Sequence, residues 1–146
     1  MTGDADSASR GELGGTGDAD SARRARGLAA YASQFGIAES EVPGHLAALI
    51  GERMAGEAIS SAGGGAWEEG PLTLRERSMI VLASLITQGG ADARLRGHVR
   101  WAVEHGVTAE QIEELATLLT IYAGFPRAST AMELIRAELA DLESQT

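Results

Sequence analysis

The sequence contains no cysteine, no lysine and no asparagine. Without cysteine the chain has no thiol nucleophile, no disulfide and no zinc–thiolate site. Without lysine it cannot form a Schiff base with a substrate, and it has no phosphate-loop lysine. Without asparagine it has no N-glycosylation sequon. Any chemistry that the chain performs therefore falls to histidine, the carboxylates, arginine and the hydroxyl side chains.

Positive charge is also scarce. The 146 residues carry 12 arginines against 21 acidic residues, and the formal net charge is -9. A nucleic-acid partner requires a clustered basic face, so this balance argues against one. No apolar run approaches the roughly 20 residues of a membrane span, and the acidic N-terminus is unlike a signal peptide. We therefore expect a cytoplasmic protein with no membrane partner.

The first 20 residues are poor in apolar side chains. The segment TGDADSA at residues 2–8 recurs at 16–22. Because such a segment cannot bury enough apolar surface to offset the entropy of ordering, residues 1–20 are predicted to form a flexible arm. The aspartates lack the glycine and the closing glutamate of a calcium-binding loop. Residues 21–146 are predicted to form one domain.

Helical periodicity dominates the rest of the chain, and no alternating strand pattern competes with it. We predict an all-α, multi-helix bundle. A glycine-rich loop holding Trp67, as a lid residue or a hydrophobic plug, should follow the second helix. The helices are expected at residues 21–35, 43–62, 73–88, 91–105, 108–122 and 127–143.

Two helix starts carry a strong local signal. Thr73 with Glu76, and Thr108 with Gln111, have the spacing of a capping box. Beyond the first of these starts, the segment SMIVLASLIT (78–87) is apolar on every side. A helix of this kind must be covered all round, by the centre of a bundle or in part by another subunit.

One helix face gathers residues of potential chemistry. Arg94, His98, Trp101 and His105 follow one another at spacings of four, three and four, which places them on one side of a helix. Leu95, Val99, Ala102 and Val103 are expected to face inward beside them. His98 is therefore a candidate general acid or base, because the ordinary histidine pKa lies near neutral pH. The alternative is a structural histidine held by hydrogen bonds.

The order of motifs resembles a known family. The chain has L-T-L-R-E-R before the apolar helix, a G-G break, L-R-G-H-V-R around His98, a T-x-E-Q-I helix start and finally Y-A-G-F-P-R-A. This order resembles the carboxymuconolactone decarboxylase family of the alkylhydroperoxidase D-like superfamily. The resemblance implies a helical subunit in trimers or hexamers, with a site near His98. It also implies an acidic small-molecule substrate and no cofactor.

Two departures from the family's relatives limit the chemistry. Counted back from His98, the redox cysteines of the peroxidase branch fall at Ala91 and Arg94, so thiol peroxidase chemistry is excluded. A cysteine found in some decarboxylases within the Y-x-G-x-P turn is Ala123 here. The absence of this cysteine puts the decarboxylation of carboxymuconolactone, the lactone for which the family is named, in question.

The predicted site centres on His98 and Glu76 as catalytic residues. Glu76 serves its capping box first and pairs with His98 second. The substrate-binding candidates are Arg77, Arg94, Trp101, Tyr122 and Trp67. Arg77 can hold a carboxylate with its planar fork or form a structural ion pair, and Trp101 and Tyr122 can line either a pocket or the core.

Metal catalysis is not expected, because His98 and His105 lie about 10 Å apart along a helix. Three functions stay open. The first is a cofactor-independent lyase that decarboxylates an acidic or enolisable small molecule. The second is a cyclase or isomerase of secondary metabolism with the same pocket. The third is a non-catalytic oligomeric binding protein.

Overall fold

The computed structural model describes residues 14–145. Within this range the chain forms seven α-helices and one π-helix, and it contains no strand. The all-α prediction is therefore confirmed for the described residues. They divide into two compact units, residues 14–70 and 71–145, which are taken in turn. That residues 21–146 act as one domain stays a prediction.

The first unit opens with α1 (Gly14–Phe35). This helix begins seven residues before Ser21, so the second copy of the TGDADSA repeat is helical where a flexible arm was predicted. The first copy lies outside the described residues. Asp20 and Arg23, one turn apart on α1, approach to 3.9 Å as an exposed ion pair. Such pairs and the alanines of this segment favour a helix.

Three short elements replace the single helix predicted at residues 43–62. They are α2 (Val42–Ile50), α3 (Glu52–Glu57) and the π-helix η1 (Ala58–Ala66). Pro43 lies in the first turn of α2, as predicted. The prediction of one helix was wrong because Gly51 has φ +82°, a conformation that ends α2 and that glycine adopts without strain. Gly63–Gly65 also continue η1, where they were expected to begin a loop.

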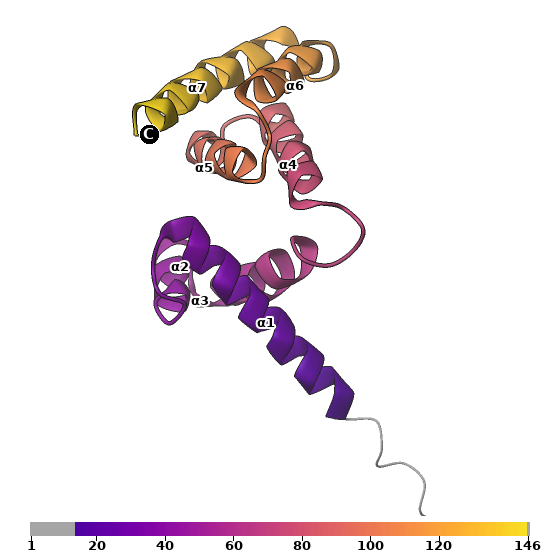
Figure 1. Cartoon of the computed structure of the whole chain (residues 1–146), viewed down its shortest axis with the longest axis vertical. Helices are drawn as coiled ribbons and strands as arrows, with labels where there is room; N and C mark the ends of the chain where they lie inside the picture. The colour runs from indigo at the N-terminus through magenta and orange to yellow at the C-terminus, as the bar shows by residue number, and fades with distance from the viewer. Residues whose placement is uncertain (1–13, 146) are drawn as a thin grey trace, which may run out of the picture. The chain divides into compact units, whose positions relative to one another are not determined.

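Glycines allow α1 and η1 to pack closely (Figure 1). A Cβ on Gly64 would lie 1.8 Å from the carbonyl oxygen of Arg23, and one on Gly27 would lie 1.8 Å from that of Ile59. Backbone therefore meets backbone at this crossing. The core of the unit consists of Val42, Leu46, Ala55 and Ile59, with Leu28, Tyr31, Ala32 and Phe35 against them.

An exposed hydrogen-bond network also joins α1 to the residues at and after the end of η1. Glu69 accepts hydrogen bonds from the Nε of Arg23 at 3.0 Å and from Nη2 of Arg26 at 2.8 Å. Arg26 also donates to the carbonyl of Gly64 at 3.3 Å. The hydrogen bond from Arg23 and the charges of both arginines lower the pKa of Glu69. The network thus connects α1 to the end of η1.

The second unit contains α4 (Leu74–Gln88), α5 (Asp92–Glu104), α6 (Ala109–Tyr122) and α7 (Phe125–Ser144). These bounds lie within two residues of the predicted ones. Both predicted capping boxes are present: Thr73 accepts from the backbone of Glu76, and Thr108 accepts from that of Gln111. Gly106 follows α5 with φ +83°, as expected of a helix-terminating glycine.

The core of this unit lies where α7 packs against α5 and α6, and where α4 packs against α5 and α6 (Figure 1). Leu95, Val99 and Ala102 of α5 are buried, but Val103 is 39% exposed, so its predicted inward orientation was wrong. The buried core residues are Leu82, Ile86, Leu95, Val99, Ala102, Val107, Ile112, Ala116, Ala131, Ile135 and Leu139.

A group of large apolar side chains faces outward from α6 and the start of α7. Leu118, Ile121, Tyr122 and Phe125 recur at helical spacing and are 58%, 81%, 78% and 69% exposed. On α4, Ile80 is 55% exposed, so a single chain does not cover that helix all round. Cover from another subunit, the alternative raised by the sequence, stays a prediction. We call Ile80, Leu118, Ile121, Tyr122 and Phe125 the apolar surface group.

Glu138 of α7 is a buried carboxylate held by two arginines of α5. It accepts hydrogen bonds from Arg96 at 3.3 Å and from Arg100, and only 1% of its side chain is exposed. Burial alone would raise the pKa of Glu138, but the hydrogen bonds from Arg100 and Arg96 outweigh burial and lower it. This ion pair network joins α5 to α7.

Replacing both arginines by glutamine is expected to destabilise the protein more than replacing Glu138 by leucine. The double variant Arg96→Gln/Arg100→Gln leaves a buried charge without compensation, at a cost of about 3 kcal/mol. In Glu138→Leu the arginines can turn to water because they are partly exposed, so the cost should be about 1 kcal/mol. Urea denaturation followed by circular dichroism measures both. Equal losses would contradict this account.

Candidate functional site

His98 occupies the middle of α5 and is partly buried. Its Nδ1 atom is inaccessible to solvent. The ring of Trp101 lies 5.2 Å from the imidazole and perpendicular to it. The contact follows from the helical spacing, since residues three apart share a face. The sequence prediction that these two rings lie together is confirmed.

The environment keeps His98 neutral. Burial, together with the positive charge of Arg94 and the nearby His105, lowers its pKa from 6.5 to about 4. At neutral pH the ring is therefore an uncharged imidazole, with one nitrogen that accepts a proton and one N–H that donates. Such a group can act as a base or a hydrogen-bond donor, whereas an imidazolium acid would form only under acidic conditions.

The lowered pKa predicts a pH-dependent stability. Because the folded pKa lies below the unfolded one, the unfolded chain binds more protons between about pH 4 and 6.5, and stability falls as the pH drops through this window. Relative to His98→Gln, the wild type should lose about 1–2 kcal/mol on going from about pH 7.5 to 4.5. Urea denaturation at both values measures the difference. Parallel losses in the two proteins would contradict the burial of a neutral ring.

A second imidazole belongs to the same group. His105 caps the end of α5, and its Nδ1 lies 2.7 Å from the hydroxyl of Ser78, a fully buried residue of α4. The ring of Trp101 lies 6.4 Å from that of His105. His98, Trp101, His105 and Ser78 thus form one row, which we call the His98 cluster. The sequence placed His105 on the same helix face as His98, but it gave no signal for Ser78, which lies 27 positions before His105.

The arginines predicted near the site have different roles. Arg77 is buried, and its Nε donates to the carbonyl of Leu72 at 3.0 Å. Arg94 is exposed, forms no ion pair among the described residues and lies close enough to His98 to influence its pKa. Arg77 thus uses one of its donors within the protein, whereas the side chain of Arg94 is exposed. Carboxylate binding by either arginine stays a prediction.

The remaining predicted residues are Glu76, Tyr122 and Trp67. Glu76 accepts from the backbone N–H and the hydroxyl of Thr73, both at 2.7 Å, and these bonds lower its pKa. Its carboxylate is thus used in the helix cap. Tyr122 is 78% exposed on α6. Trp67 belongs to the first unit. Substrate contacts by Tyr122 and Trp67 stay predictions.

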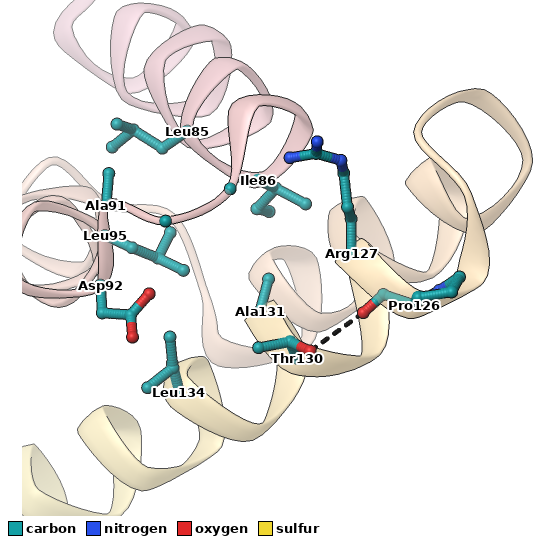
Figure 2. Close-up of a pocket in the computed structure, with 12 residues that line it drawn as sticks. Leu85, Ile86, Ala91, Asp92, Leu95, Pro126, Arg127, Thr130, Ala131 and Leu134 are labelled. Atoms are coloured by element: carbon teal, nitrogen blue, oxygen red, sulfur yellow. Dashed lines mark hydrogen bonds between the residues drawn. The ribbon is translucent and has the colours of Figure 1, made fainter.

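A separate hollow of about 260 Å³ lies among the end of α4, the start of α5 and the first turns of α7 (Figure 2). His98 does not line it, although Ala91 and Leu95, earlier on α5, do. We call it the α7 cavity. Its lining residues are Leu85, Ile86, Gly89, Gly90, Ala91, Asp92, Leu95, Pro126, Arg127, Thr130, Ala131 and Leu134.

The described part of the chain offers no metal-binding cluster. No three His, Cys, Asp or Glu side chains within residues 14–145 converge on one point. Nor is any helix of this range both long and apolar enough to cross a bilayer. What the structure presents is a neutral, half-buried imidazole beside an aromatic ring and an exposed arginine, a group suited to moving or sharing a proton.

The fold and the site together define a class: an all-helical protein with a histidine site and no thiol. The model of the carboxymuconolactone decarboxylase family matches residues 53–137, more than half of the chain. The chain therefore belongs to this family, as the motifs indicated.

One relative is a 4-carboxymuconolactone decarboxylase of Acinetobacter baylyi (strain ATCC 33305 / BD413 / ADP1). It is 33% identical over 81 residues, which make up 56% of this chain and 60% of the relative. The matched region thus covers less than two thirds of that protein.

Proposed function

We propose that the protein is a lyase of the decarboxylase type that acts on a small acidic or enolisable molecule with its own side chains, without a cofactor. The observation that carries the proposal is the neutral, half-buried His98 at the position that the family motif marks. The family match and the decarboxylase relative support the reaction class.

The mechanism divides the work between an arginine and an imidazole. Arg94 binds the carboxylate that leaves, since its guanidinium is exposed and forms no ion pair among the described residues. The bond between this carboxylate and its carbon breaks, carbon dioxide departs, and the electron pair passes into an enolate. The N–H of neutral His98 donates a hydrogen bond to the enolate oxygen. The same N–H then delivers its proton to the carbon, and water restores the proton at that nitrogen and leaves hydroxide to the solvent, because Nδ1 is inaccessible to solvent.

Product analysis tests the reaction class. The purified full chain is incubated with 4-carboxymuconolactone and with simple β-keto acids, and the products are analysed by mass spectrometry. Loss of carbon dioxide that depends on His98 is the expected result. A substrate that is consumed without any carbon dioxide release would overturn decarboxylation.

An isomerase or cyclase is the second candidate, and the pKa of His98 favours it specifically. A neutral imidazole can remove a proton from one carbon and return it to another without loss of carbon dioxide. The product would then have the mass of the substrate. The same mass measurement therefore separates the two candidates.

We further propose that the apolar surface group is the contact between copies of this chain. Leu118, Ile121, Tyr122 and Phe125 are close in sequence and each more than half exposed, and large exposed apolar patches usually mark interaction sites. The double variant Ile121→Asp/Phe125→Asp should therefore lower the molar mass measured by light scattering. Replacing the exposed Met54 of the first unit by Asp serves as a control. A monomeric wild type would refute the proposal.

A further inference from the structure

The α7 cavity has an apolar body and a charge at each end. Leu85, Ile86, Leu95, Ala131 and Leu134 make up most of its walls, together with Ala91. Figure 2 shows Arg127 at one end and Asp92 at the opposite end, with apolar side chains between them. The volume of about 260 Å³ lies just below the range usual for small-molecule sites, so a ligand must be small.

Arg127 is positioned by the glycine break that follows α4. One N–H of its guanidinium donates to the carbonyl of Gln88, the last residue of α4. Gly89 has φ +68°, a conformation that favours glycine, and a Cβ there would lie 2.5 Å from Nη1 of Arg127, which would have to shift. Arg127 forms no ion pair with any carboxylate among the described residues. Arg127 lines the cavity beside the end of α4 (Figure 2).

We infer that the α7 cavity binds a small monocarboxylate with an apolar, cyclic or branched body. The guanidinium of Arg127 supplies charge-assisted hydrogen bonds to the carboxylate. The hydrocarbon body lies against the leucine and alanine walls, where its burial from water supplies the remaining affinity. The inference rests on the cavity and does not require the reaction proposed for His98.

The same geometry selects against a second acidic group. A dicarboxylate bound through Arg127 would place its far carboxylate either against the apolar walls or near Asp92. The first position removes a charge from water without a partner, and the second sets two negative charges close together. Either arrangement costs affinity. The cavity therefore distinguishes monoacids from diacids of the same skeleton.

Matched ligands test this selection. Isothermal titration calorimetry compares cyclohexanecarboxylate, trans-cyclohexane-1,4-dicarboxylate and cyclohexanecarboxamide on the full chain. The monoacid is expected to bind with a Kd of about 1 mM or lower, and the diacid and the amide about 10-fold more weakly. Methyl NMR shifts should map the bound monoacid to Leu85, Leu95 and Leu134, which line the cavity. The absence of saturable binding, equal affinities, or shifts elsewhere would overturn the inference.

Two variants assign the charges. Arg127→Gln should weaken the monoacid about 10-fold, whereas Arg136→Gln, also on α7 but outside the cavity lining, should not. Asp92→Asn, which leaves Arg127 in place, should bring the diacid's affinity closer to the monoacid's. If neither variant changes these affinities, the assignment is refuted. His98→Gln should bind the monoacid like wild type, so a failure of the proposed reaction is told apart from a failure of this site.

Discussion

Replacing His98 by glutamine is expected to lower turnover about 100-fold while leaving the helical fold in place. Glutamine retains a hydrogen-bond donor but cannot accept and release a proton at neutral pH. The loss should therefore appear in kcat, because the proton-transfer step is removed while carboxylate binding by Arg94 remains. Steady-state assays with the product analysis described above measure it, and circular dichroism confirms the fold.

The pH profile and a control histidine sharpen this test. Since His98 must be neutral to act, kcat/KM of the wild type should rise through about pH 4 and stay level toward neutrality. His45→Gln is the matched control, because His45 lies on α2 in the first unit, with its ring 4.6 Å from that of Phe35 and tilted by 50°. It should retain full turnover. If His98→Gln is as active as His45→Gln, His98 takes no part in the proton transfer.

Replacing Gly64 by alanine is expected to destabilise the first unit by about 3 kcal/mol or more. The added Cβ would lie 1.8 Å from the carbonyl oxygen of Arg23 and 2.6 Å from its carbonyl carbon. Both atoms belong to the backbone of α1, so no side chain can move aside to relieve the overlap. The two elements must separate, and the core behind them opens.

Gly44→Ala is the matched control for this change. Gly44 is exposed on α2, and a Cβ there would meet nothing within 4 Å. Alanine should therefore stabilise that helix by about 0.5–1 kcal/mol, since it restricts the unfolded chain. Hydrogen exchange of the α1 amides, together with urea denaturation, measures both variants. Equal protection in the two would show that α1 and η1 adapt to a larger residue.

The second unit could be predicted from the sequence almost completely, because its signals are local. Thr73 and Thr108 define helix starts with side chains three positions away, and Gly106 marks an end by its own conformation. The first unit could not be predicted in the same way. The apolar spacing at residues 43–62 continues past Gly51, so it gives no sign that the helix ends there. Gly63–Gly65 belong to η1 because this element packs closely against α1, which is distant in the sequence.

In the candidate site, too, contacts within one helix could be predicted from the sequence, whereas contacts between helices could not. Spacing within one helix predicted that His98 meets Trp101, since both lie on α5. The partner of His105 could not be predicted, because Ser78 reaches it from α4 through tertiary packing. Arg127 was likewise missed: its place beside the α7 cavity depends on the turn after α4, which brings Gly89 next to it. Burial, which shifts the pKa of His98 away from neutrality, also cannot be derived from spacing.

The π-helix η1 has one further consequence. A π-helical segment holds an extra residue relative to the α-helical repeat, so it could lose one residue and still form a continuous helix. Deleting one residue there, such as the exposed Ser61, would let ordinary α-helical bonding close and would change the direction in which the next residues of this unit face. Glu69 would then turn away from Arg23 and Arg26. The length of this segment, more than its composition, therefore sets whether Glu69 faces the arginines of α1.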